Sequence, residues 1–296
     1  MTVDTVVIDE AMLALPAPAL RPYVAWYSGY RQQGLAPAVH RGLPSPYLTF
    51  ILTLDDPLVI AAHPDPAQAR GSYTALLGGL HTSPALITHS GRQSGIQIAV
   101  RPLAARTLFG LPAGELGGQD LPLDTVLGPL GELLRERLRT VDGWAERFAA
   151  LDDALLTLAG AAADRPQPQP EVHWAWQALL RTGGALPVAD LVRETGWSSR
   201  HLQERFRRET GLTPKAAARV IRFDRARRML GAASGPWRLA DLAAHCGYFD
   251  QAHLAREFRS LAGCAPSTWL ESEGLELAKF RNVQGSGDPV APEYEA

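Results

Sequence analysis

The chain has 296 residues, of which 46% are hydrophobic and 20% charged, and its formal net charge is −2. This length favours two globular domains. The longest uncharged stretch, residues 71–91, is interrupted by Gly, Pro, Ser, Thr and His, which excludes it as a membrane span. The first ten residues, MTVDTVVIDE, lack the pattern of a secretory signal. The two cysteines, Cys246 and Cys264, belong to no metal-binding or C-x-x-C motif, so we expect a cytoplasmic protein without a metal or cofactor.

Residues 21–100 contain strand-like pieces separated by Gly and Pro, which predict a small antiparallel barrel or sandwich. The pieces are Tyr23 to Tyr30, Tyr47 to Leu54, Leu58 to Ala62, Ala85 to Thr88 and Gly95 to Val100. From Pro102 to Gly160, leucines recur at helical spacing, so helices are expected to pack beside the sheet. The fold class predicted for the chain is α+β, with an all-α C-terminal domain.

Two sets of side chains in this N-terminal part suggest binding sites. Aromatic residues could line an apolar effector pocket, although aromatics at strand spacing are first of all core residues. The pocket candidates are Trp26, Tyr30, Tyr47 and Phe50. Four histidines lack the spacing of metal ligands and are interpreted as surface or loop residues. These are His40, His63, His81 and His89.

A proline-rich segment, residues 164–170 (DRPQPQP), cannot continue a helix, which indicates a short interdomain spacer. We therefore predict an N-terminal domain over residues 1–165, a linker over 166–170 and a second domain over 171–283. Residues 284–296 lack apolar periodicity and are expected to be disordered.

The charge is distributed unevenly between these parts. Residues 1–170 contain 12 basic and 16 acidic residues, a net charge of −4, whereas residues 171–283 contain 17 basic and 12 acidic residues, a net charge of +5. Between Gly196 and Gly231 ten basic residues stand against three acidic ones. Such a segment suits a phosphate-facing surface, although on charge alone a solvated helix face is the more common explanation.

A pattern of six residues occurs twice within residues 185–270. The first copy is Leu191, Gly196, Leu202, Phe206, Gly211 and Pro214, and the second is Leu242, Gly247, Leu254, Phe258, Gly263 and Pro266. All intervals agree except the step from the first Gly to the next Leu, which is six in one copy and seven in the other. The pattern predicts a repeated pair of short helices, with the first Gly of each copy ending the first helix and with Ser198 and Asp250 capping the second.

The second helix of each pair buries a Leu and a Phe four residues apart, which turns its polar residues outward. Arg and Gln on such a face suit the edges of guanine and adenine. The predicted base-reading residues are Arg200, Gln203, Gln251, His253 and Arg256.

The segments GWSSRHLQERFRRETGLTP, RFDRARRML and ADLAAHCGYFDQAHLAREFRSLAGCAPSTW together resemble the DNA-binding domain of the AraC/XylS family. The resemblance implies two helix-turn-helix units joined by a central helix, here Pro214 to Leu230, each placing its second helix in the DNA major groove. On this basis we expect phosphate contacts from Ser199, Arg207, Arg219, Arg222, Arg227 and Arg259, the arginines on the central helix being available for salt bridges as well.

The combined observations predict a sequence-specific transcription factor, expected to be an activator, whose partners are double-stranded DNA and RNA polymerase. An all-α interaction module is the alternative, because helix-turn-helix geometry also occurs without DNA. No P-loop, H-E-x-x-H or G-x-S-x-G motif is present, so we expect no enzyme activity. The resemblance implies that the N-terminal domain, which is often a cupin-like barrel in this family, binds an effector or mediates dimerisation. We expect it to bind a small-molecule effector, and homodimer formation is compatible with the same sequence.

Overall fold

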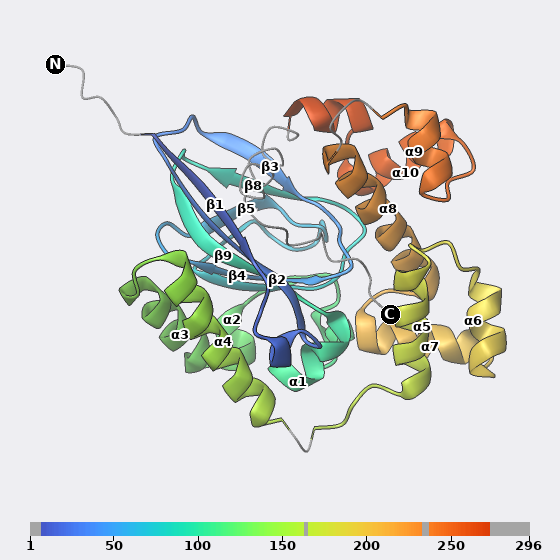
Figure 1. The fold of residues 1–296 in the computed structure, drawn as a ribbon, viewed down its shortest axis with the longest axis horizontal. Helices are drawn as coiled ribbons and strands as arrows, with labels where there is room; N and C mark the ends of the chain where they lie inside the picture. Colours follow the sequence, from blue (N-terminus) through green and yellow to red (C-terminus); the bar gives the residue numbers. More distant parts are fainter. Residues whose placement is uncertain (1–6, 163–164, 233–236, 273–296) are drawn as a thin grey trace.

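The computed structural model describes residues 7–162, 165–232 and 237–272, and its N-terminal part is built on two antiparallel sheets (Figure 1). The first sheet has the spatial order β1 (Ile8–Ala14), β2 (Val24–Gln33), β9 (Gln93–Val100), β4 (Leu48–Thr53), β7 (Ala75–Gly78) and β10 (Asp120–Pro122). The second sheet has the order β3 (Ala38–Gly42), β8 (Ala85–His89), β5 (Leu58–Ala62) and β6 (Gly71–Tyr73).

The two faces of the larger sheet bury different side chains, because neighbouring residues of a strand point in opposite directions. One face meets the smaller sheet, where Ile51, Ile60 and Ile87 belong to a small apolar cluster. The other face, which includes Tyr27 and Phe50, belongs to the main core. The predicted α+β class with an antiparallel N-terminal sheet structure is confirmed.

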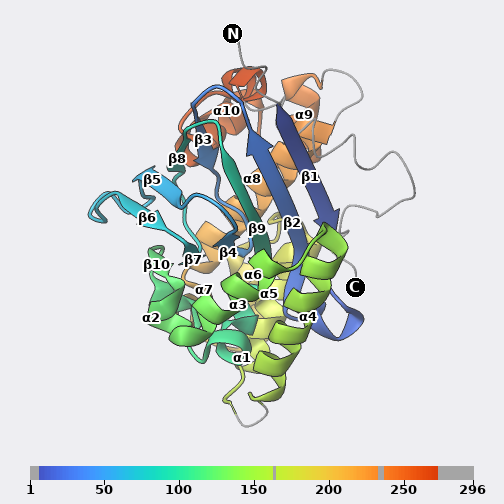
Figure 2. The same cartoon turned by 90° about the vertical axis from the view of Figure 1, so that its left-hand side faces the viewer.

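Helices of the N-terminal part cover the second face of the larger sheet (Figure 2). They are α1 (Ala105–Phe109), α2 (Leu123–Leu127), α3 (Pro129–Thr140) and α4 (Trp144–Gly160). The Tyr27 ring stacks on Phe148 of α4, and its hydroxyl donates a 2.8 Å hydrogen bond to Asp152. Trp144 lies directly over Gly29, where any Cβ atom would collide with the indole ring. The glycine therefore allows α4 to lie close to β2.

The C-terminal part is helical, as predicted. Its helices are α5 (Pro170–Arg181), α6 (Val188–Thr195), α7 (Ser199–Thr210), α8 (Pro214–Ala232), α9 (Leu239–His245) and α10 (Gln251–Ala262). The spacer residues 166–169 belong to no helix or strand. The predicted tail, residues 284–296, lies outside the described residues, and the predicted domain bounds stay predictions.

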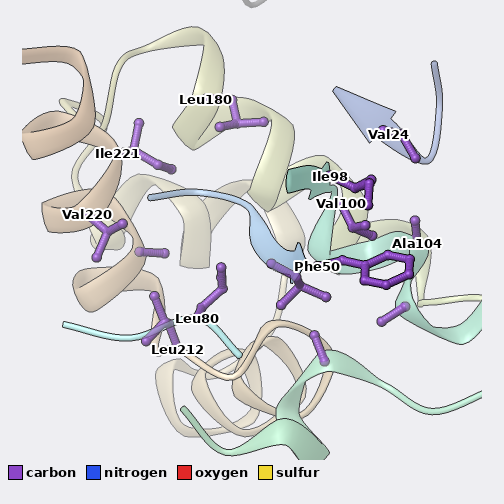
Figure 3. Close-up of a cluster of buried hydrophobic side chains, with 14 of the residues drawn as sticks. Val24, Phe50, Leu80, Ile98, Val100, Ala104, Leu180, Leu212, Val220 and Ile221 are labelled. Atoms are coloured by element: carbon purple, nitrogen blue, oxygen red, sulfur yellow. The ribbon is translucent and has the colours of Figure 1, made fainter. Parts of the chain in front are cut away.

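The two parts share one apolar core rather than standing apart. Val220 and Ile221 of α8 belong to the same buried cluster as Leu80, Ile98 and residues of the larger sheet, as the close-up in Figure 3 shows. At this interface α8 lies close to the start of β4, next to Tyr47. Burial raises the pKa of Tyr47, and the nearby charge of Asp224 on α8 raises it further.

A bidentate ion pair also joins the N-terminal and C-terminal parts. Arg106 of α1 donates two hydrogen bonds, of 2.7 and 2.8 Å, to the carboxylate of Glu209 at the end of α7. Both side chains are mostly buried, with 16% and 11% of their surface exposed. Gly114, in the 3-10 turn Ala113–Leu116, approaches the carbonyl oxygens of Arg207 and Arg208 so closely that a Cβ atom would collide with them. Helix α7 is therefore held at its C-terminal end by the N-terminal part.

We expect Arg106→Ala and Glu209→Ala to be strongly coupled in a double-mutant cycle of urea unfolding. The coupling should be about 1–2 kcal/mol, because the pair is bidentate and shielded from water. The exposed pair Arg193 and Asp190 is the matched control, and its coupling should be much smaller. Equal coupling energies for the two pairs would contradict this view of the interface.

Candidate nucleic-acid interface

The first helix-turn-helix unit consists of α6 and α7. Helix α6 ends at Gly196, whose φ of +68° is a left-handed conformation that a residue without Cβ adopts readily. The Ser198 hydroxyl then accepts a hydrogen bond from the His201 N–H at 3.2 Å and caps α7. Trp197 fills the turn, its ring meeting His201 edge-on at 4.7 Å. The predicted glycine and cap are confirmed here.

The second unit, α9 and α10, repeats this arrangement. Gly247 has a φ of +74°, and the Asp250 carboxylate accepts a 2.6 Å hydrogen bond from the His253 N–H. Tyr248 takes the place of Trp197 and meets the His253 ring edge-on at 5.3 Å. The same local physics therefore sets the angle between the helices in both units.

Buried side chains fix both units to α8. Leu202, Phe206, Leu254 and Phe258 are each 0% exposed, as the repeat predicts. The Phe258 ring lies 5.0 Å from Phe223 of α8. Bidentate hydrogen bonds of 2.7 and 3.1 Å from Arg219 to Glu257 add a polar link between α8 and α10. The orientation of α10 is thus set by α8.

The outward faces of α7 and α10 contain most of the predicted base-reading residues. Arg200 and Gln203 are exposed on α7, and Gln251 and Arg256 are exposed on α10. His253 is half-buried: its Nδ1 accepts a hydrogen bond from the Phe249 N–H at 3.2 Å, which leaves only the Nε2 edge for another partner. The geometry thus presents four of the five side chains fully, and their role in base reading stays a prediction.

The predicted phosphate contacts fall into two groups. Ser199, Arg207 and Arg259 are exposed, and neither of these two arginines has an ion-pair partner among the described residues. Arg219, Arg222 and Arg227 have partners inside the protein. Arg222 donates to the Gly184 carbonyl at 2.7 Å and lies over the Tyr248 ring, and Arg227 pairs with the buried Asp224 at 2.7 Å. For Arg219 and Arg227 the structure favours the salt-bridge alternative, whereas Arg222 is held by a backbone carbonyl and an aromatic ring. Phosphate binding by all three stays a prediction.

The structure identifies the residue that makes the second turn one position longer. Trp197 corresponds to Tyr248 and Ser198 to Asp250, so Phe249 is the additional residue. Its side chain is 91% exposed, the largest value among the exposed large hydrophobic residues of the described chain. The seven-residue interval in the sequence contained this signal, but it did not show which residue would face solvent.

A separate cleft of about 320 Å³ opens where the two N-terminal sheets part. Its lining includes Tyr30 and Thr53 of the larger sheet, and Leu58 and Thr88 of the smaller sheet. Burial raises the pKa of Tyr30, so its hydroxyl stays neutral. The cleft combines an aromatic ring with hydroxyl groups, a combination that can orient a small polar molecule.

The four predicted pocket aromatics do not gather around this cleft. Of them, only Tyr30 lines it. Trp26 contacts Tyr47, with ring centroids 6.5 Å apart, at the end of the sheet nearest α8. Phe50 lies on the opposite face and packs on Phe109. The prediction of one pocket formed by all four is therefore corrected: strand spacing identifies aromatics but not which sheet face each one occupies.

The four histidines singled out in the sequence lie in different surroundings and do not form a common metal centre. His63 is buried, with Nδ1 2.7 Å from Asp120 and Nε2 3.2 Å from the Tyr73 hydroxyl. His63 lies in the loop that follows β5, as expected, but its ring is buried, and the two hydrogen bonds offset the cost of burying it. In the described ranges, no group of three or more His, Cys, Asp or Glu residues is arranged to hold a metal ion. No helix in the same ranges is both long and apolar enough to cross a bilayer.

Comparison with known proteins agrees with this arrangement. Residues 175–272 match the family model of a helix-turn-helix domain, and residues 13–122 match a domain of unknown function, DUF6597. An uncharacterized HTH-type transcriptional regulator of Bacillus subtilis (strain 168), YbfI, is 31% identical over 90 residues, or 30% of this chain. The match spans about a third of that relative, 32% of its length.

One solved structure shares the fold over most of the chain. An apo variant of ToxT from Vibrio cholerae strain SCE256 has a TM-score of 0.50 at 12% identity, covering 83% of this chain and 96% of that one. The C-terminal domain of AraT, a response regulator from Geobacillus stearothermophilus, covers 43% of this chain and 98% of its own, with 18% identity and a TM-score of 0.32. Residues 175–272 are therefore a helix-turn-helix domain of the AraC type, in agreement with the resemblance found in the sequence.

Proposed function

We propose that this protein is a transcription factor rather than an enzyme, and that it binds double-stranded DNA through α7 and α10. The observation that supports this most strongly is the pair of capped, outward-facing helices on one rigid helix, α8. At about 1.5 Å per residue, the 19 residues of α8 span roughly 29 Å, close to one turn of DNA. Two successive major-groove segments can then be read by one chain. RNA polymerase is a further proposed partner.

Binding by the full chain should fall steeply as salt rises, because arginine–phosphate contacts release counterions. Alanine at Arg200, Gln203, Gln251 or Arg256 should each cost about 1–3 kcal/mol and relax preference at particular base pairs. Arg207→Ala should instead weaken all sequences alike. Titrations on selected and scrambled duplexes over a range of salt test this, with thermal melting as the folding control. Reader variants that lose affinity without changing preference would contradict the assignment.

We further propose that the N-terminal part controls DNA binding through an effector. It touches the C-terminal end of each DNA-contacting helix: the Arg106–Glu209 bridge holds α7, and Pro84 lies against Gly263 at the end of α10. A ligand that favours one arrangement of these contacts would shift the position of both helices. The proposed effector site is the cleft beside Tyr30, and its size and hydroxyl groups suit a small polar molecule.

A thermal-shift screen of the full chain against small polar molecules should find a stabilising ligand. At a free concentration of 100 times Kd, the ligand should add about 2.7 kcal/mol of stability. Ser90→Trp should abolish the shift, because Ser90 is exposed and lines the cleft. Ser72→Trp is the control, since Ser72 is exposed on β6 outside the cleft. A ligand that stabilises Ser90→Trp as much as the unaltered chain binds elsewhere.

The helical hairpin α3–α4 supports homodimer formation. Leu130 and Leu133 on α3 are 54% and 65% exposed, and Leu156 on α4 is 38% exposed. The Arg137–Asp153 ion pair, 3.1 Å long, places these leucines at the same end of the antiparallel hairpin. Covering an apolar surface of this kind lowers the free energy of the protein in water, and a second copy of the hairpin would cover it.

Sedimentation of the full chain should show a dimer that Leu133→Asp converts to a monomer, because a charge on the covered surface must be desolvated. Val39→Asp is the control, since Val39 is 59% exposed on β3, away from the hairpin. A monomeric unaltered chain would remove the dimer from the proposal. A dimer unaffected by Leu133→Asp would place its interface elsewhere.

A further inference from the structure

Phe249 breaks the symmetry between the two helix-turn-helix units. In the first unit the aromatic residue of the turn, Trp197, is followed directly by the helix cap Ser198. In the second unit Phe249 stands between the corresponding aromatic residue, Tyr248, and the cap Asp250. Tyr248 already fills the turn, with only 5% of its surface exposed. Phe249 is therefore not required to pack the unit, and its ring lies almost wholly in solvent.

The backbone nevertheless holds Phe249 in one place. Its N–H donates to His253 Nδ1 at 3.2 Å, and the His253 ring is itself packed against Tyr248. The positive φ of Gly247 and the Asp250 cap fix the residues on either side. A large apolar side chain presented on a fixed turn costs solubility unless a partner covers it, and a fixed position lowers the entropy lost on binding.

The position of the turn indicates which partner that is. Phe249 immediately precedes the N-terminal end of α10, the end at which a recognition helix contacts base edges. Gln251 and Arg256 are exposed on the same helix, and the groove edge contains one apolar group that an aromatic ring can contact, the 5-methyl group of thymine. Resting on the proposed DNA-binding function, we propose that Phe249 reads a thymine through its methyl group at the end of the site nearest α10.

The test uses a duplex enriched from a random pool by the full chain. Each thymine is replaced in turn by uracil, which removes the methyl group and keeps base pairing, and Kd is measured for the unaltered chain, Phe249→Ala and Phe249→Leu. We expect one or two replacements at one end of the site to weaken the unaltered chain about fourfold, the value of one buried methyl group. Phe249→Ala should bind about tenfold more weakly and be insensitive to those replacements. Phe249→Leu should lie between the two.

The controls separate this inference from the function on which it rests. Because Phe249 is exposed, the melting temperature of Phe249→Ala should equal that of the unaltered chain. If the unaltered chain enriches no duplex, the proposed DNA-binding function fails. If it enriches one, but Phe249→Ala binds with unchanged affinity or keeps the full uracil sensitivity, DNA binding stands and the assignment of Phe249 is overturned.

Discussion

Helix α8 is the element on which the rest of the molecule depends, because it is buried on several sides at once. Phe223 and Ala226 are 0% exposed, and Phe223 holds Phe258 of α10 at 5.0 Å. Asp224 is also buried, and hydrogen bonds from Arg227 and Arg228 offset the cost of desolvating its charge. A helix fixed in this way allows little independent rotation of the two units, so the distance between their DNA-facing helices is set by the protein before DNA binds.

The same helix joins the C-terminal and N-terminal parts into one core. Its side chains Val220 and Ile221 lie in the buried cluster that reaches the N-terminal sheet (Figure 3). Contacts at Glu209 and Gly263 add links at the C-terminal ends of α7 and α10, leaving their N-terminal ends exposed. A change in the N-terminal part can therefore act on both helices without contact at the surface proposed to meet DNA. Such coupling requires two arrangements of this interface that an effector binds unequally.

The sequence predicts those features that local physics determines. The interval pattern locates the turns, Gly196 and the caps, because a left-handed C′ residue and a helix cap depend on near neighbours. Strand β1 was not predicted because it is an edge strand whose residues are all half-buried or exposed, without regular alternation. The face that Phe50 occupies depends on packing against a distant helix. The partner of Arg219 lies 38 residues away, so charge counts alone could not separate it from the exposed Arg207. The sequence showed only that the second turn is one residue longer, and it did not identify Phe249 as the additional residue.

We propose that one chain places two helices on one face of DNA at a spacing fixed by α8. Hydroxyl-radical and methylation footprinting of the full chain on an enriched duplex measures this directly. We expect each chain to protect two major-groove segments, on the same face of the duplex and about 10 base pairs apart. A single protected segment, or two segments on opposite faces of the duplex, would contradict it.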